Sequence, residues 1–157
     1  FKGTERFPDR QYDHLIEING GRNNAFTNRD YTGYYVSLPS SKLDEILMLE
    51  ADRMTGLIMQ EQSLNNELKV VQEERRMRVD NSPVGTAYET LMGAMYKGSQ
   101  YEWPIIGSME DIGSITRDHA ERFYRTYYAP NNATLVIVGD IDVERTKAMI
   151  ARHFGRL

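Results

Sequence analysis

The stretch NNELKVVQEERRMRVDN, residues 65–81, has the pattern of a long helix with an unusual face. At ~100° per residue, one narrow stripe of this helix joins two aliphatic residues, two acids and a base: Leu64, Glu67, Val71, Glu74 and Arg78. Leu68 lies at the border of the stripe, whereas Glu73 and Arg76 point elsewhere. Two carboxylates therefore share a face with aliphatic residues, and a buried carboxylate is costly unless it is paired or bound to a metal.

The segments on both sides of this helix predict an α+β domain. Apolar periodicity and caps predict helices at 8–19, 42–60, 62–80, from Pro83 toward Gly98, after Thr116 and at 143–154. Turn residues and strand-forming residues predict a hairpin with strands at 23–28 and 31–38 and a buried strand at 133–138. In the helix after Thr116, Phe123 and Tyr127 are expected to face inward. We therefore expect a mixed sheet with the hairpin at or near one edge and helices packed mainly on one face.

The composition excludes several classes of protein. The chain has 157 residues, 40 % hydrophobic and 27 % charged, which fits one domain with a real core. A net charge of −4 gives no support to nucleic-acid binding, and the lack of cysteine excludes disulfides and thiol chemistry. No apolar run approaches the ~18 residues of a membrane span. The compartment stays open between a bacterial periplasm and cytoplasm, and the missing initiator Met suggests a true N-terminus upstream.

Two interpretations of the acids remain open from the residues alone. Glu67 and Glu74 are seven residues apart, two helical turns or ~10 Å along the axis. They are either half-buried acids paired with Arg or Lys from a neighbouring helix, or one metal ligand and one supporting acid. The three histidines, His14, His119 and His153, form neither HExxH nor HxxEH. We expect each of them to be a surface or packing residue.

Several motifs occur in an order that is more specific than any one of them. They are FKGT at the start, GGRNNAFTNRDYTGYYVSLP, the helix with ELKVVQEE, WPIIGSMEDIGSI, and FYRTYYAPNNATLVIVGDID. In this order they resemble the pitrilysin family of zinc metallopeptidases, the inverzincins, which includes insulysin and the mitochondrial processing peptidase. The resemblance covers essentially the whole chain and implies a partial metallopeptidase-like domain.

The resemblance assigns roles to both acids. In the family, a helix with the motif HxxEH carries two zinc-binding histidines and the catalytic glutamate, and a glutamate some tens of residues downstream completes the zinc site. Matching the E-x6-E segment of that family places the zinc ligand at Glu74 and a supporting acid at Glu67. The chain departs from the family pattern because it starts just after the point where HxxEH would end. We therefore expect zinc in the intact parent protein and none bound to this chain, since a catalytic zinc needs three protein ligands.

The resemblance also implies how a substrate is held. A peptide is expected to add as an extra strand to an exposed sheet edge. The segment NNAFT matches the edge strand of the family, which assigns substrate backbone contacts to Asn24, Ala25, Phe26 and, less firmly, Thr27. A small residue such as Ala25 lets a peptide approach closely. Without the resemblance, an ordinary hairpin strand would be the preferred interpretation.

The function expected from the resemblance belongs to a larger protein. Residues 1–157 are expected to be a single partial domain, the N-terminal peptidase domain of a two-domain protein that cleaves peptides or unfolded segments. A second homologous domain or subunit would close a chamber around the substrate. The alternative is a non-catalytic partner subunit that forms chamber wall and binds substrate. The chain alone is expected to be inactive and to self-associate through the apolar surface that its missing neighbours would cover.

Overall fold

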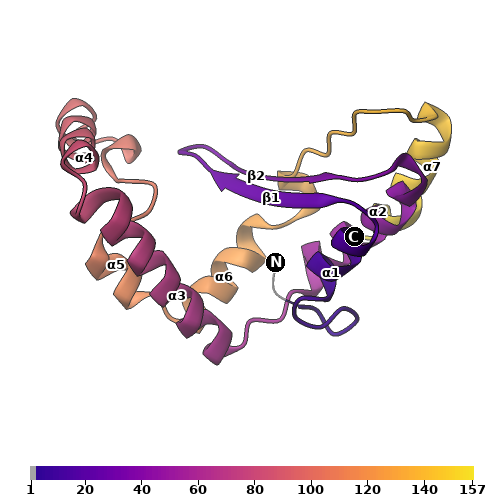
Figure 1. Cartoon of the computed structure of the whole chain (residues 1–157), viewed down its shortest axis with the longest axis horizontal. Helices are drawn as coiled ribbons and strands as arrows, with labels where there is room; N and C mark the ends of the chain where they lie inside the picture. The colour runs from indigo at the N-terminus through magenta and orange to yellow at the C-terminus, as the bar shows by residue number, and fades with distance from the viewer. Residues whose placement is uncertain (1–2) are drawn as a thin grey trace. The chain divides into compact units, whose positions relative to one another are not determined.

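The computed structural model describes residues 3–157 and is rich in helix (Figure 1). In chain order the elements are α1 (Gln11–Ile18), β1 (Arg22–Thr27), β2 (Thr32–Ser37), η1 (Ser40–Lys42), α2 (Leu43–Gly56), α3 (Glu61–Arg75), the π turn η2 (Arg76–Asp80), α4 (Pro83–Met95), η3 (Gln100–Glu102), α5 (Met109–Ser114), α6 (Arg117–Tyr127), η4 (Pro130–Asn132) and α7 (Val143–Phe154). The predicted α+β class is confirmed, and the predicted helices and hairpin form within a few residues of their expected ends. Among the described residues, no helix is long and apolar enough to cross a membrane.

Chain contacts divide the protein into two compact units. The first unit contains residues up to 25, 34–59 and 121–157, and the second contains 26–33 and 60–120. The hairpin of β1 and β2 therefore contributes its tip to the second unit and its base to the first.

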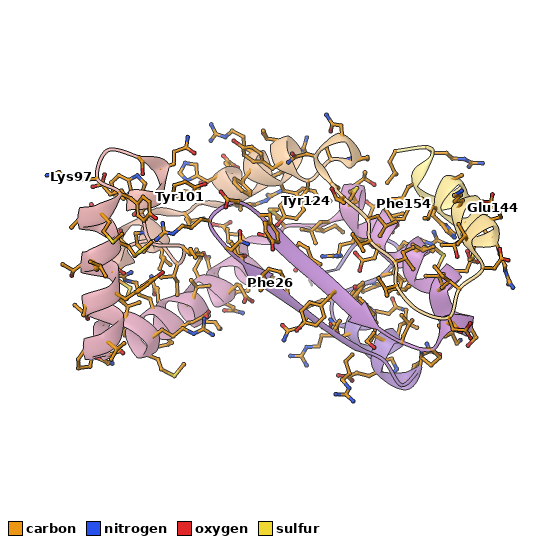
Figure 2. The ribbon with its side chains drawn as sticks, turned by 90° about the horizontal axis from the view of Figure 1, so that it is seen from above. Phe26, Lys97, Tyr101, Tyr124, Glu144 and Phe154 are labelled. Atoms are coloured by element: carbon orange, nitrogen blue, oxygen red, sulfur yellow. The ribbon has the colours of Figure 1, made fainter. Side chains whose placement is uncertain are left out.

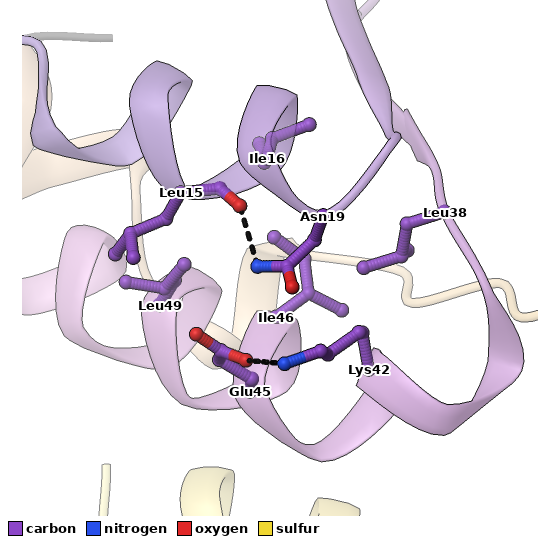
Figure 3. Close-up of a pocket in the computed structure, with 8 residues that line it drawn as sticks. All are labelled: Leu15, Ile16, Asn19, Leu38, Lys42, Glu45, Ile46 and Leu49. Carbon is purple, nitrogen blue, oxygen red and sulfur yellow. Dashed lines mark hydrogen bonds and ion pairs between the residues drawn. The ribbon is translucent and has the colours of Figure 1, made fainter.

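The core of the first unit lies between α1 and α2. Tyr12 and Ile16 of α1 pack with Ile46 and Leu49 of α2, and Val36 of β2 packs against this cluster. Beside this core, eight residues line a small hollow between the two helices: Leu15, Ile16, Asn19, Leu38, Lys42, Glu45, Ile46 and Leu49 (Figure 3). Two internal contacts lie at its rim. The Asn19 amide donates to the Leu15 carbonyl at 2.7 Å, and Lys42 forms an ion pair with Glu45 at 3.2 Å.

The second unit is built from α3, η2, α4 and α5. Helix α3 packs against α5 and η2, and α4 packs against η2 and η3. Ile112 of α5 is almost completely buried. Helix α4 begins as predicted at Ser82–Pro83, because the Ser82 hydroxyl accepts a hydrogen bond from the Gly85 amide at 3.1 Å and Pro83 occupies the first turn.

The sheet is smaller than predicted. Among the described residues the sheet has two strands, β1 and β2, instead of a mixed sheet. The predicted buried strand at 133–138 is wrong: this segment is not in a strand, and Val136 and Val138 are 75 % and 90 % exposed. A strand requires a neighbour for its backbone hydrogen bonds, and the sheet of the described residues pairs only β1 with β2.

Helix α2 shares a core with α1 and the hairpin base, whereas α3 belongs to the second unit. One further expectation about packing needs correction. In α6, Phe123 and Tyr127 are exposed and Tyr124 is buried instead. The Tyr124 hydroxyl explains its inward position, because it donates to the Arg53 carbonyl at 2.7 Å and accepts from the Leu57 amide at 3.2 Å.

Candidate functional site

Helix α3 turns Glu73 and Glu74 in different directions. The Glu73 side chain is 72 % exposed and pairs with Arg76, whereas the Glu74 side chain is 36 % exposed. Glu74 Oε1 forms an ion pair with Arg78 at 2.8 Å, one helical turn later. A carboxylate has two oxygens, so this pair leaves Oε2 of Glu74 as a possible metal ligand. Glu67 lies two turns earlier on the same helix and is exposed.

Arg75 is the buried residue of α3, although the sequence pattern predicts no role for it. Its guanidinium donates two hydrogen bonds of 3.0 Å to the carboxylate of Glu89 on α4. The same group donates to the Gly107 carbonyl at 2.7 Å and forms an ion pair with Asp80 of η2 at 3.4 Å. These contacts raise the pKa of Arg75, chiefly through the hydrogen bonds to Glu89, so the guanidinium stays charged. One side chain thus ties the end of α3 to α4, to η2 and to the turn before α5.

The π turn η2 begins directly after Arg75. The Asn81 amide donates to the Arg76 carbonyl at 2.8 Å, five residues back, which is the hydrogen bond of a π turn. Helix α4 packs on this turn at Gly85, where a Cβ atom would lie 2.1 Å from the Arg78 carbonyl oxygen. Only glycine allows so close an approach of two backbones. The Arg75 contacts and the packing of α4 at Gly85 therefore both restrain the residues after Glu74.

The hairpin has a fixed register. The Asn28 amide donates to the Tyr31 carbonyl at 3.0 Å, and hydrogen-bonded pairs alternate with non-bonded pairs along an antiparallel ladder. Phe26 consequently lies opposite Gly33. A Cβ atom on Gly33 would come within 2.6 Å of the Phe26 ring, which agrees with this pairing.

This register turns alternate backbone groups of β1 away from β2. Phe26 and Asn24 bond to the partner strand, whereas the N–H and C=O groups of Asn23, Ala25 and Thr27 point to the outer edge. The Ala25 amide agrees with this geometry, because it donates to the side-chain oxygen of Asn24 at 2.8 Å instead of to β2. Among the described residues, β2 is the only strand that pairs with β1.

The tip of the hairpin is anchored to the turn that follows α4. The Arg29 guanidinium donates to the carbonyls of Tyr101 and Trp103, the latter at 2.8 Å. The Tyr101 hydroxyl donates to Asp30 at 2.5 Å, and this hydrogen bond raises the pKa of Tyr101. Figure 2 shows Tyr101 on this turn and Phe26 on the hairpin. The anchor restrains the end of β1 that carries Phe26.

The described residues do not assemble a complete metal site. They contain no group of three or more His, Cys, Asp or Glu side chains that could hold a metal ion. His14 is exposed, His119 contacts the start of its own helix, and His153 lies 2.8 Å from Asp44. The prediction that the histidines are surface or packing residues is thus confirmed. Glu74 fits a zinc site as one oxygen ligand, and the remaining ligands would have to come from outside the described residues.

The predicted site residues lie on two elements. Glu67 and Glu74 are both on α3, and Asn24, Ala25, Phe26 and Thr27 are all on β1. The roles assigned to these six residues remain predictions, although the register directs the backbone N–H and C=O groups of Asn24 and Phe26 toward β2 and not toward the outer edge. Sequence reasoning missed Arg75 and Arg29, whose partners are distant in the chain.

Comparison with known proteins gives consistent matches along the whole chain. Residues 1–109 match the family described as Insulinase (Peptidase family M16), and residues 114–157 match the Peptidase M16 inactive domain. The zinc protease PqqE of Helicobacter pylori is 35 % identical over 157 residues, which is 100 % of this chain and 35 % of that protein.

Solved structures agree with this match. A crystal structure of a protease from Helicobacter pylori superimposes with a TM-score of 0.95 at 35 % identity, over 98 % of this chain and 37 % of that one. The first half of the periplasmic protease PqqL from Escherichia coli has the same fold, with a TM-score of 0.85 at 22 % identity over 100 % of this chain and 35 % of that one. The chain thus spans about a third of the length of the curated relatives that it matches.

Proposed function

The chain belongs to peptidase family M16, and on this premise we propose that the whole protein is a zinc-dependent endopeptidase with Glu74 as one of its metal ligands. Relatives that are named zinc proteases support the metal and the reaction class. The single observation that carries the ligand assignment is the orientation of Glu74. Its side chain is half as exposed as that of Glu73, and only one of its oxygens is needed for the pair with Arg78.

Zinc would be held by Glu74 together with ligands outside the described residues, which we expect to be the two histidines of an HxxEH motif upstream of Phe1. When bound, zinc supplies an activated water for attack on a peptide bond. Glu67 is the proposed supporting acid, two turns before Glu74 on the same helix. A supporting acid of this kind orients a ligand without binding the metal.

The substrate is proposed to bind as an added strand on the outer edge of β1. The outward N–H and C=O groups of Ala25 and its two alternate neighbours, Asn23 and Thr27, would form the backbone hydrogen bonds. Backbone hydrogen bonds do not depend on the side chains of the substrate. They therefore suit a protease that accepts peptides or unfolded segments of varied sequence. The anchored hairpin tip reduces the entropy that is lost when β1 accepts a strand.

A second homologous half is proposed to close the chamber. The solved relative that is described as the first half of a longer protease supports this organisation. A non-catalytic subunit of the same fold is the competing function, and the gene upstream of Phe1 separates the two. An HxxEH motif there supports the peptidase, and its loss supports the non-catalytic subunit.

The proposed function is tested by replacing Glu74 and its neighbour in the full-length protein. Glu74→Gln removes the charge of the proposed ligand, and we expect loss of bound zinc and of hydrolysis of a fluorogenic peptide. Glu67→Gln should reduce both by ~10–100-fold, as is typical of residues that support a metal ligand. Glu73→Gln is the matched control, because its side chain is exposed and one residue away. Equal zinc content in the Glu74→Gln and Glu73→Gln proteins would contradict the assignment.

A further inference from the structure

Phe123 and Tyr127 form an exposed aromatic face on α6. They are one helical turn apart, their ring centres are 4.6 Å apart, and they are 57 % and 52 % exposed. Glu121 and Arg125 pair with each other on the other side of the helix, about 120–160° away from the two rings. Large aromatic rings gain much from burial, and exposed apolar surface of this kind marks a place that another segment covers.

The beginning of the described chain is joined to the same helix. Thr4 forms an antiparallel bridge with Leu57, and the Ile58 amide donates to the Gly3 carbonyl at 3.0 Å. The Leu57 amide in turn donates to the Tyr124 hydroxyl of α6 at 3.2 Å. All these residues belong to the first unit, as does the aromatic face. A single residue, Leu57, therefore links the beginning of the described chain to α6.

The path of the chain at this point is fixed by tight contacts. Thr4 is buried, and its hydroxyl donates to Asp52 at 2.5 Å and accepts from the Phe7 amide at 2.9 Å. A Cβ atom on Gly3 would lie 2.4 Å from the Asp9 amide nitrogen, so the two backbones approach as closely as only glycine allows. Any segment that precedes Gly3 consequently starts from a defined place beside α6.

We propose that the aromatic face of α6 is covered by the segment that precedes Gly3 in the whole protein. This inference rests on the proposed function, which assigns the HxxEH motif to that segment. The two histidines and the glutamate of such a motif have the spacing i, i+3 and i+4, so in a helix they share one face. The opposite face of that helix is free to be apolar and to pack on the two rings.

Covalent continuity favours this occupant over a second copy of the chain or a second half of the protein. An extended chain advances ~3.3–3.6 Å per residue, so a segment anchored at Gly3 needs few residues to reach α6. Its attachment also keeps it at a high effective concentration next to the aromatic face, whereas a separate chain has to be recruited from solution.

Photo-crosslinking of the full-length protein tests the proposal. The photoreactive residue p-benzoylphenylalanine is placed at position 123, and the cross-linked peptides are identified by mass spectrometry after digestion. We expect most of them to come from the segment upstream of Gly3. The same label at position 125 is the matched control, because Arg125 lies on the opposite side of the same helix, and it should give few of these peptides. Cross-links from position 123 to a second copy or to the second half would overturn the proposal.

A second measurement needs no label. Hydroxyl-radical oxidation of the unchanged full-length protein should modify Phe123 and Tyr127 several-fold less than it does in urea, and equal oxidation would refute a covered face. The cross-linked segment also separates this proposal from the proposed function. An upstream segment without HxxEH would support the packing and contradict the peptidase, whereas HxxEH in a segment that cross-links elsewhere would refute only the packing.

Discussion

In each unit of this protein, one arginine with little solvent exposure joins several neighbours. In the second unit Arg75 joins α3 to its neighbours, and in the first unit Arg53 has a similar place beside Glu50. The Arg53 guanidinium lies over the Tyr34 ring, 4.4 Å from its centre, and Tyr12 donates to Glu50. Burial and the adjacent Glu50 raise the pKa of Tyr12, so its hydroxyl remains a donor at neutral pH. Each guanidinium is paired with a carboxylate, which offsets part of the cost of removing its charge from water.

Glu50→Ala is predicted to destabilise the protein by about 2 kcal/mol, because a charged hydrogen-bond partner is removed from the partly buried Arg53 and Tyr12. The free energy of unfolding in urea measures the effect. Glu45→Ala on the same helix is the control, since the pair of Glu45 with Lys42 is more exposed than that of Glu50 with Arg53 and should contribute below about 1 kcal/mol. Equal losses for the two variants would show that the Glu50 network contributes no more than a surface pair.

At the scale of elements, the contact between η2 and α4 restrains the end of the site helix. Gly85 allows α4 to approach the Arg78 carbonyl, and the Thr86 hydroxyl donates to the Val79 carbonyl at 2.9 Å. These contacts act on the backbone of η2, whereas Arg75 acts on its side chains. The turn that follows Glu74 is thus restrained independently of any metal.

Gly85→Ala is predicted to destabilise the protein by about 1–3 kcal/mol, because the new methyl group overlaps the Arg78 carbonyl and forces the backbones apart. Gly93→Ala on the same helix is the matched control. A Cβ atom there meets its nearest atom at 3.9 Å, so the change should be neutral or stabilise by up to about 1 kcal/mol. Thermal unfolding distinguishes the two variants, and a tolerated Gly85→Ala would refute the close packing of α4 on η2.

The helices and the hairpin were predictable because their signals are local. Periodic apolar residues, the cap at Ser82 and the turn at Asn28 act over a few residues. The π turn has no such signal, and the segment 133–138 has the composition of a strand but no partner among the described residues. Strand formation depends on a neighbour, which a local pattern does not reveal.

Part of the candidate site was also predictable from local sequence signals. Helical phase placed Glu74 and Glu73 on different faces, and their different exposure agrees with it, whereas Glu67, which shares the predicted stripe with Glu74, is exposed. Arg75 was missed because it is charged, although it continues the apolar spacing of Leu68 and Val71 on α3. Its burial depends on Glu89, which lies fourteen residues later and cannot be paired with it by spacing alone.

At the scale of the whole molecule, two groups of exposed apolar side chains stand out among the described residues. One is the segment 133–138, where Val136 and Val138 are the most exposed, and the other is a stripe along α4 that consists of Val84, Tyr88, Leu91 and Met95. Exposed patches of this kind mark surfaces that other chains or domains cover. The exposed apolar surface is consistent with the length of the relatives, which are about three times as long as this chain.

Residues 1–157 produced alone are therefore predicted to self-associate. Light scattering over a range of concentrations should show a mass above the 18.2 kDa of one chain. Replacing Val136 and Val138 together by Lys should reduce the association, because charges oppose both apolar burial and strand pairing. A monomer at all concentrations would count against the prediction, and association that the double variant leaves unchanged would place the contact elsewhere.

Anomalous diffraction at the zinc edge tests the proposed assignment of Glu74 as a zinc ligand of the whole protein. Crystals of the full-length protein should show one strong peak about 2.0–2.2 Å from a carboxylate oxygen of Glu74, with the Arg78 guanidinium on the other oxygen. A zinc peak away from Glu74, or no peak from protein that is active and protected from chelators, would contradict the assignment of Glu74 as a zinc ligand.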